Sequence, residues 1–319
     1  MSQFLSKCTV NVMADAAANL LAGNLVAFPT ETVYGLGADA CNADAVARIY
    51  SVKGRPVDHP LIVHVASMDA LGDWASDVPG YAISLARDFW PGPMTLIIKR
   101  SGLAGDFVTG GQDTVGVRVP DHPVALGLLL AFAQIGGKGV AAPSANRFGN
   151  VSPTTAQAVA DELSAHLSAA DQILDGGPCE VGVESTIIDC TGDVPRILRP
   201  GAVTVEMINE STGLAAVGSV ENSEIRVSGS LDSHYAPVAT VVLDQSPVAG
   251  QGFIAMADVA TPDGVVRLAA PKTYDEFARV LYAALRAADE QGLKTVVVVQ
   301  PQGSGITIAI RDRVKRAAK

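Results

Sequence analysis

The chain has 319 residues, of which 48% are hydrophobic and 18% charged, and its formal net charge is −10 at pH 7. Such an apolar composition excludes a disordered protein, and the length suffices for two domains with hydrophobic cores. The negative charge disfavours a dedicated nucleic-acid binder, because it repels a phosphate backbone, and an enzyme acting on small molecules is expected instead.

Residues 1–206 alternate between short apolar segments rich in β-branched residues and segments with helical periodicity. This alternation predicts an α/β domain with a twisted open sheet. The predicted strands are Leu25–Phe28, Leu61–Val65, Met94–Ile98, Val115–Val119, Val140–Ala142 and Thr186–Ile188, and the predicted helices are Ala43–Tyr50, Tyr81–Phe89, Val124–Ala133 and Thr155–Leu163.

Residues 207–237 are rich in Ser, Gly, Asn and Glu and lack sustained periodicity, which predicts a linker. Residues 238–319 are expected to form a smaller Rossmann-like α/β domain without a dinucleotide fingerprint. Its predicted strands are Val238–Leu243, Gly252–Met256 and Lys294–Val299, and a capping box at Thr273 and Glu276 opens its main helix. The basic residues of the last nine positions are interpreted as a solvated helix end, with an RNA-binding patch as the alternative.

The chain shows no signs of export, membrane insertion or a structural metal. Its apolar stretches are shorter than the roughly 20 residues that span a bilayer, and its N-terminus has no continuous apolar core. The four cysteines form no C-x-x-C pair, which argues against a zinc site and a disulfide scaffold. A cytoplasmic protein with reduced thiols is expected.

Polar residues gather in three clusters beside predicted strands. Phe28–Gly37 (FPTETVYGLG) ends the first strand, where open α/β sheets bind ligands. In Ser51–His64 (SVKGRPVDHPLIVH), Lys53 and Arg55 point the same way on an extended segment, which suits a triphosphate. Ala141–Thr155 (AAPSANRFGNVSPTT) leads from a strand into a helix start, which favours anions. Taken singly, the clusters also fit a structural turn, solvated cations and helix capping.

Together, six motifs resemble the YrdC-like threonylcarbamoyl-adenylate synthases: PTETVYGLG, the K-x-R of SVKGRP, the S-x-N of APSAN, VGVRVPDHP, VGVESTIID and ILRPG. The resemblance is strong from Asn24 to about Ala202. The HYAP sequence that ends the linker and the additional C-terminal domain resemble the long, two-domain form of this family. The resemblance therefore implies a YrdC-like catalytic domain, a linker that acts as a lid, and a C-terminal domain.

The resemblance implies an enzyme that condenses L-threonine, bicarbonate and ATP to threonylcarbamoyl-adenylate and pyrophosphate. The product serves modification of the adenosine next to the tRNA anticodon, so downstream tRNA threonylcarbamoyl-transfer proteins are expected partners, whereas stable direct tRNA binding is not expected. An N-carboxy-threonine attacks the α-phosphate, and no protein nucleophile is needed. Mg²⁺ is expected to be held mainly by the ATP phosphates, and no metal-ligating residue is assigned.

The family's site residues are carried over to matching positions of this chain. Lys53 and Arg55 are the expected catalytic residues and face the phosphates. Arg118 is expected to bind the threonine carboxylate through two hydrogen bonds, because an arginine in an apolar strand needs an anionic partner. The expected ATP site comprises Arg55, His59, Thr114, Ala142, Ser144, Asn146, Ser152, Arg199 and Tyr235, and the expected threonine site comprises Thr32, His64, Arg118 and Ser185.

Two positions depart from the family pattern. His59 stands where many members have an amide, and Asp232 and Ser233 precede His234 and Tyr235 where the linker usually carries a Lys or Arg. We therefore expect Tyr235 to reach the nucleotide as a lid residue, without a phosphate-neutralising role for the linker.

Two alternative functions are a YrdC-like enzyme that forms carbamoyl-adenylate and a non-catalytic RNA-binding module. The length of the chain and its lack of a C-x-x-C array argue against the first. Its net charge, together with the presence of the expected site residues, argues against the second.

Overall fold

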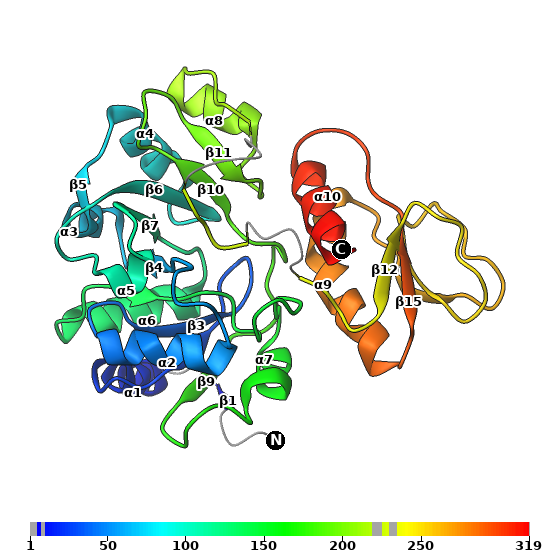
Figure 1. Ribbon diagram of the computed structural model, residues 1–319, viewed down its shortest axis with the longest axis horizontal. Coiled ribbons are helices and arrows are strands. Elements are labelled where there is room, and N and C mark those ends of the chain that lie inside the picture. The colour runs from blue at the N-terminus through cyan, green and yellow to red at the C-terminus, as the bar shows by residue number, and fades with distance from the viewer. Residues whose placement is uncertain (1–4, 8–9, 219–224, 230–234, 319) are drawn as a thin grey trace.

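The computed structural model describes residues 5–7, 10–218, 225–229 and 235–318, which form two α/β domains (Figure 1). The first contains a large mixed sheet and the second a four-stranded parallel sheet. In this described part of the chain, no helix is long and apolar enough to span a membrane.

The large sheet has eleven strands in the order β1-β9-β2-β3-β8-β4-β7-β6-β10-β11, with β5 beside β6. The sheet is mixed, because it contains parallel pairs such as β4 with β7 and antiparallel pairs such as β3 with β8. The strands are β1 (Leu5–Lys7), β2 (Val26–Phe28), β3 (Gly35–Asp39), β4 (Ile62–His64), β5 (Ala75–Asp77), β6 (Met94–Arg100), β7 (Thr114–Arg118), β8 (Val140–Ala141), β9 (Gln172–Asp175), β10 (Thr186–Asp189) and β11 (Arg196–Arg199).

Four helices of the first domain, α2, α6, α7 and α8, begin at a residue whose side chain accepts a hydrogen bond from their first turn. Asn42 and Thr155 accept hydrogen bonds from the first turns of α2 and α7, and Gly54 ends α2 in the left-handed conformation. The helices are α1 (Val10–Leu21), α2 (Ala43–Lys53), the 3₁₀ turn η1 (Met68–Ala70), α3 (Leu71–Trp74), α4 (Gly80–Phe89), α5 (Asp106–Thr109), α6 (Pro123–Gln134), α7 (Ala156–Leu163) and α8 (Val205–Thr212).

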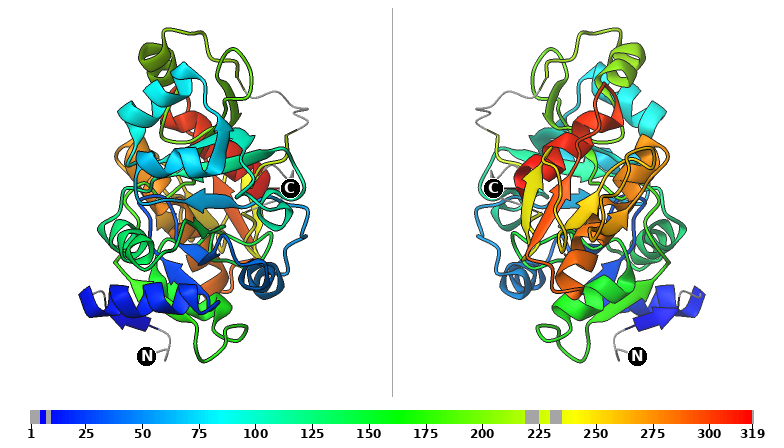
Figure 2. Two further views of the ribbon diagram at one scale, coloured as in Figure 1. Left: turned by 90° about the vertical axis from the view of Figure 1, so that its left-hand side faces the viewer. Right: turned by 90° about the vertical axis from the view of Figure 1, so that its right-hand side faces the viewer.

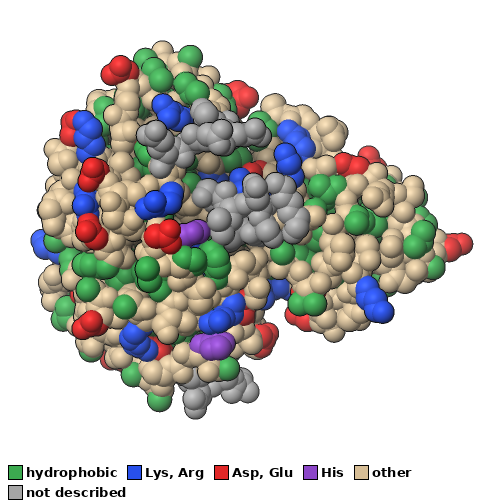
Figure 3. Space-filling model, in the orientation of Figure 1, with side chains coloured by type: hydrophobic (Ala, Val, Ile, Leu, Met, Phe, Trp, Pro, Cys, Tyr) green, Lys and Arg blue, Asp and Glu red, His purple; other side chains and the backbone are tan. Residues whose placement is uncertain are grey.

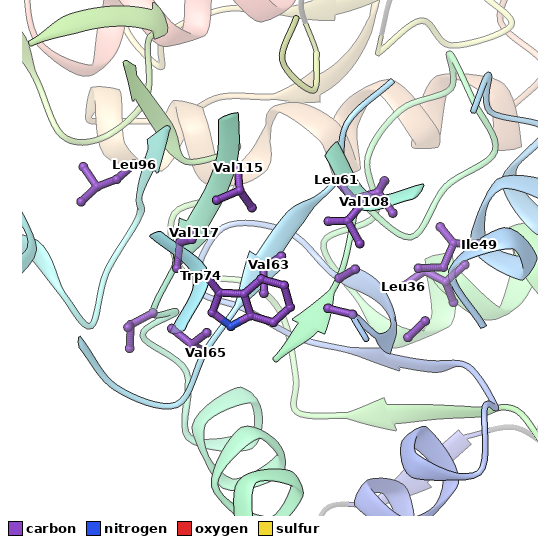
Figure 4. Packing of buried hydrophobic residues seen from close by; sticks show 14 of the residues in the cluster. Leu36, Ile49, Leu61, Val63, Val65, Trp74, Leu96, Val108, Val115 and Val117 are labelled. Atoms are coloured by element: carbon purple, nitrogen blue, oxygen red, sulfur yellow. The ribbon is translucent and has the colours of Figure 1, made fainter. Parts of the chain in front are cut away.

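The main core of the first domain lies between the large sheet and its covering helices. Figure 4 shows Trp74 beside Val63 and Val65, among aliphatic side chains from the neighbouring strands. The indole of Trp74 is fully buried, and its N–H donates to the carbonyl of Lys138, so the one polar group of the ring is hydrogen-bonded inside the core. This packing fixes the strands whose ends carry the polar clusters.

The second domain has strands β12 (Thr240–Leu243), β13 (Gly252–Ile254), β14 (Val266–Ala269) and β15 (Thr295–Val298), in the order β12-β15-β13-β14. Helices α9 (Tyr274–Glu290) and α10 (Ile306–Ala317) lie between this sheet and the first domain (Figure 1). Figure 2 shows the molecule from the side of the first domain in its left view and from the side of the second domain in its right view. Because Val33, Val151 and Val183 pack into the core of the second domain, the two domains share one hydrophobic cluster.

The structure confirms the α/β class of both domains and the helix start at Thr273, whose hydroxyl accepts from the N–H of Glu276 at 3.1 Å. Helix α8 extends into the predicted linker, to Thr212. The interpretation of the C-terminal basic residues as a solvated helix end is wrong for Arg313, whose side chain is completely buried. It lies on the face of α10 that packs against the first domain, where it meets an acidic partner.

Candidate active site

A solvent-open hollow, called the cavity below, lies in the first domain where β2, β4 and β7 end and β10 begins, and the empty space within it, including its open mouth, is about 530 Å³. It collects side chains from all three polar clusters and from the three later motifs, VGVRVPDHP, VGVESTIID and ILRPG. The lining residues are Thr30, Thr32, Val33, Gly35, Arg55, Ile62, His64, Arg118, Ala142, Pro143, Ser144, Glu184, Ser185, Arg199, Ser228, Gly229 and Tyr235.

Arg118, the last residue of β7, contributes a buried positive charge to this cavity. Its Nη2 lies 2.7 Å from Oε1 of Glu31 and donates to the hydroxyl of Thr32 at 3.1 Å. Glu31 also accepts from the N–H of Asp121 through Oε2. The anionic partner of Arg118 in this structure is thus Glu31, which holds the guanidinium against the loop of Thr32, and its predicted contact with a threonine carboxylate stays a prediction.

His64, the last residue of β4, is neutral in this environment. Burial and then the nearby charge of Arg118 lower its pKa to about 3. Its ring meets Phe28 edge-on, and Nδ1 has no hydrogen-bond partner among the described residues. An uncharged imidazole, whose buried Nδ1 lacks a partner among the described residues, therefore lines the cavity.

Arg55 and Arg199 meet at Ser228, a linker residue. Arg55 donates to the hydroxyl of Ser228 at 3.2 Å, and Arg199 donates to its carbonyl at 2.9 Å. Arg199 also donates to the carbonyl and hydroxyl of Ser185, each at 3.0 Å. Burial lowers the pKa of Arg55 to about 10, so this group remains charged at neutral pH, and burial also lowers the pKa of Arg199. Two cations therefore converge on one side of the cavity.

Lys53 lies behind the cavity rather than on its surface. Its ammonium group donates to the carbonyl of Ser144 at 2.5 Å and to that of Asn146, and burial places its pKa well below the usual value. Its own carbonyl accepts from the N–H of Phe148. In this structure Lys53 therefore fixes the loop of residues 144–152, called the S-x-N loop below. The predicted contact of Lys53 with a phosphate stays a prediction.

The S-x-N loop is held by internal contacts. The side-chain amide of Asn146 donates to the carbonyls of Arg147 and Asn150, and Ser152 donates to Oε1 of Glu184 at 2.6 Å. Although burial opposes its ionisation, neighbouring arginines and hydrogen bonds lower the pKa of Glu184 to about 2. This carboxylate is ionised at neutral pH and lines the cavity.

Tyr235 closes the cavity from the linker side. It adopts a left-handed backbone conformation, with φ at 62°, and its ring stacks on that of Tyr282 at 5.7 Å between centroids. Gly229 lies directly against its hydroxyl, because a Cβ at Gly229 would lie only 2.1 Å from that oxygen. The predictions on Asp232, Ser233 and His234 fall outside the described residues.

The cavity brings together nine of the predicted site residues, namely Thr32, Arg55, His64, Arg118, Ala142, Ser144, Ser185, Arg199 and Tyr235. Lys53, His59, Thr114, Asn146 and Ser152 lie outside its lining. His59 packs edge-on against Phe148, and Thr114 borders a smaller hollow under the linker. Sequence reasoning missed Glu31 and Glu184, although a carboxylate within an otherwise apolar or hydroxyl-rich motif is a signal for a buried ion pair.

On the outer face shown in Figure 3, acidic and basic side chains are interspersed over the described residues. The cations of the candidate site are largely buried, each with at most 7% of its surface exposed. Fold and site thus define a two-domain α/β protein with a cationic pocket, which suits a small anionic ligand.

Comparisons with known proteins agree with this class. Residues 18–201 match the Sua5_yciO_yrdC family, described as telomere recombination, and residues 203–319 match the C-terminal domain of threonylcarbamoyl-AMP synthase. The threonylcarbamoyl-AMP synthase of Bacillus subtilis is 39% identical, over 96% of this chain and 92% of its own length. That of Pyrococcus abyssi is 38% identical, over 95% and 93%.

A crystal structure of P. abyssi Sua5 complexed with L-threonine superposes with a TM-score of 0.87 at 36% identity, covering 98% of this chain and 96% of the other. The chain belongs to the threonylcarbamoyl-AMP synthase family, in its two-domain Sua5 form. The resemblance inferred from the six motifs is therefore confirmed.

Proposed function

We propose that this threonylcarbamoyl-AMP synthase condenses L-threonine, bicarbonate and ATP in the described cavity and releases pyrophosphate. The observation that carries the proposal is the convergence of Arg55, Arg118 and Arg199 in one pocket. Three buried guanidinium groups match the anionic groups of the substrates, namely a carboxylate and a chain of phosphates. The solved relative with bound L-threonine supports a threonine subsite.

In this proposal, the threonine amine attacks bicarbonate and water leaves, which gives an N-carboxylate. That carboxylate attacks the α-phosphorus of ATP, the bond from phosphorus to the bridging oxygen breaks, and pyrophosphate leaves with both bond electrons. Arg118 and Thr32 hold the threonine carboxylate, and the neutral His64 and Ser185 complete that subsite. Catalysis consists of orientation and charge stabilisation, so no protein nucleophile is required.

The nucleotide is proposed to lie on the other side of the cavity. Arg55 and Arg199 face its phosphates after the linker residue Ser228 gives up their hydrogen bonds. Ala142, Ser144 and Tyr235 line this side. His59, Thr114, Asn146 and Ser152, which lie outside the lining, complete the proposed ATP site. Mg²⁺ would be held mainly by the phosphates and would offset their charge during attack.

The domain division at residues 1–206, 207–237 and 238–319 is part of this proposal, as is a Rossmann-like C-terminal domain, which its parallel strands support. A cytoplasmic location and delivery of the product to tRNA threonylcarbamoyl-transfer proteins also remain predictions. The comparisons favour this function over the carbamoyl-adenylate and RNA-binding alternatives, because the full-length relatives are threonylcarbamoyl-AMP synthases.

Pyrophosphate release from ATP tests the proposed function. The rate is measured with all three substrates and then with threonine or bicarbonate omitted in turn. We expect each omission to remove most of the signal, because the attacking carboxylate contains atoms of both molecules. Release that persists without either substrate would contradict the proposal.

A further inference from the structure

A buried charged cluster joins the C-terminal domain to the wall of the cavity. Its centre is Glu184, which precedes β10 and is only 5% exposed. Oε1 of Glu184 accepts from Ser152 at 2.6 Å, while Oε2 accepts from Tyr282 of α9 at 2.8 Å and from Arg313 of α10 at 2.7 Å. One carboxylate of the first domain thus receives two donors from the second.

Arg313 reaches three parts of the pocket wall at once. Besides Nε on Glu184, its Nη2 donates to the carbonyl of Pro200 at 3.0 Å, next to Arg199 in the chain. Its guanidinium also lies over the ring of Tyr235, 5.4 Å from the centroid. Asp312 forms an ion pair with the third nitrogen, Nη1, so that the orientation of the guanidinium group is fixed.

The contacts of this cluster lie mainly on the ATP side of the cavity. Ser152, Arg199 and Tyr235 all belong to the proposed ATP subsite, and the cluster touches each of them or the adjoining backbone. Three of the four threonine-side residues, Thr32, His64 and Arg118, are held by other contacts within the first domain. The fourth, Ser185, follows Glu184 in the chain, and its hydroxyl accepts from Arg199. Loss of the cluster would therefore disturb the ATP side more than the threonine side.

Stability alone is a weak reason for such a cluster. Removing a buried ion pair from water costs free energy that its attraction only partly returns, and apolar residues of similar volume are often as stabilising. A cluster with directional hydrogen bonds does fix the positions of its members better than apolar packing does. Its geometry suits the task of holding ligand-binding groups within a few tenths of an ångström.

We propose that Arg313 and Tyr282 of the C-terminal domain are positioning residues for the ATP subsite and act through Glu184. The C-terminal domain thereby completes the nucleotide side of an active site whose lining residues all lie in the first domain and the linker. This inference rests on the proposed function, and it assigns a role to two residues that lie outside the cavity lining.

The test is steady-state pyrophosphate release by the full-length variants Arg313→Met, Glu184→Gln and Tyr282→Phe. KM for ATP is measured at saturating threonine and bicarbonate, and KM for threonine at saturating ATP. For Arg313→Met and Glu184→Gln we expect KM for ATP to rise about tenfold, since small displacements of positioning groups are costly, while KM for threonine stays within about twofold. For Tyr282→Phe, which loses one hydrogen bond, we expect a rise of about threefold.

Arg267→Met is the matched control. Arg267 is also a well-bonded arginine of the C-terminal domain, but it donates to the carbonyls of Ala255, Met256, Val259 and Ala269 within that domain. We expect it to lower the melting temperature without changing KM for ATP. If it raises KM for ATP as Arg313→Met does, the effect is general destabilisation and the inference is wrong.

The double variant Glu184→Gln with Arg313→Met covers the case in which Arg313→Met alone does not fold. It leaves no uncompensated charge at the centre of the cluster, so we expect its melting temperature to recover while the high KM for ATP persists. An unchanged KM for ATP, or equal changes in both KM values, would overturn the inference. Failure of the proposed function would be distinct, because wild-type release would then not depend on threonine and bicarbonate.

Discussion

At the scale of single residues, Arg118 shows how a buried charge is kept ready for a ligand. Glu31 and Thr32 hold its guanidinium while leaving it on the cavity surface. An arginine fork binds a carboxylate through two parallel hydrogen bonds, which the single ammonium group of lysine does not reproduce. The geometry of the group, and not its charge alone, is therefore expected to determine threonine affinity.

The first prediction concerns Arg118→Lys. We expect KM for threonine to rise by about tenfold or more, equivalent to a loss of about 1.4 kcal/mol, with a smaller change in KM for ATP. Initial rates of pyrophosphate release with each substrate varied in turn measure both constants. If KM for ATP changes more than KM for threonine, the two sides of the pocket are assigned wrongly.

The second prediction concerns pH and His64. In the folded protein its pKa is lowered to about 3, whereas an exposed histidine titrates near 6.5. Between these values the unfolded chain binds a proton that the folded chain does not. The stabilising contribution is complete above pH 6.5 and is lost as the pH falls towards 3, by about 1.4 kcal/mol per pH unit.

Urea unfolding of wild type and His64→Gln between pH 7.5 and 4.5 measures this contribution, because the other titrating groups cancel in the difference. We expect the wild type to lose more free energy of unfolding than the variant below about pH 6.5. Curves that stay parallel down to pH 4.5 would show that His64 is not held neutral by burial.

At the scale of elements, periodicity and local signals predicted the strands β2, β4, β6, β7, β8 and β10, as well as helices α2, α4, α6, α7 and α9. Strand β3 was missed because its sequence, GLGAD, contains two glycines. Glycine is needed there: a Cβ at Gly37 would lie 2.7 Å from the side chain of Val140 and 2.8 Å from that of Phe28. This requirement arises from close packing with distant segments, so no local pattern reveals it.

The motifs predicted much of the cavity lining, because they lie at strand ends that the sheet brings together. They did not predict which side chains serve as supports. Lys53 and Arg55 share an extended-segment pattern, yet the structure places Lys53 at the end of α2 and Arg55 beyond it. Likewise, the partner of Arg313 lies 129 residues away, at Glu184. Such pairings depend on tertiary packing, which a single sequence does not display.

The third prediction concerns the S-x-N loop, which Lys53 links to α2. In Lys53→Met the carbonyls of Ser144 and Asn146 lose a donor, at a cost of about 2 kcal/mol. We expect faster amide hydrogen exchange in residues 144–152 of the ATP-free protein, together with slower pyrophosphate release. Lys99→Met is the control, since Lys99 makes an exposed ion pair on β6.

Unchanged exchange of this loop in Lys53→Met, combined with slower turnover, would mean that Lys53 acts on the substrate and not through the loop. If Lys53→Met and Lys99→Met showed equal exchange of the loop and normal turnover, Lys53 would act neither on the substrate nor through the loop. Hydrogen exchange followed by mass spectrometry separates these outcomes, because it reports the loop without any ligand present.

At the scale of the whole molecule, the two domains are joined by polar contacts as well as by the shared hydrophobic cluster. Arg286 of α9 forms an ion pair with Glu162 of α7 at 2.6 Å and also donates to the carbonyl of Val151. Glu162 in turn accepts from the N–H of Arg147 and the amide of Asn150, both in the S-x-N loop. The C-terminal domain therefore contacts this loop at a second place.

This connectivity implies that the domains stabilise each other when a ligand binds. Any ligand that binds only the folded pocket stabilises the folded state, by about 2.7 kcal/mol at a concentration of 100 times Kd. If the loop, Glu184 and Tyr235 tighten around the nucleotide, the helices that hold them become less free to open. ATP bound to the first domain is therefore expected to protect α9 and α10 of the second.

The fourth prediction is that ATP slows amide exchange in residues 274–290 and 306–317, while strand β14, at the edge of the second sheet, changes little. Hydrogen exchange of the wild type with and without ATP measures this, and Arg313→Met is the matched comparison. ATP is added to that variant at a concentration that saturates the weakened site. We expect it to protect the S-x-N loop still. Helix α10 is expected to lose most of its protection by ATP, because the bond from Arg313 to Glu184 is absent. Protection of α10 that is equal in both proteins would mean that the shared hydrophobic cluster, and not the buried charges, transmits the effect.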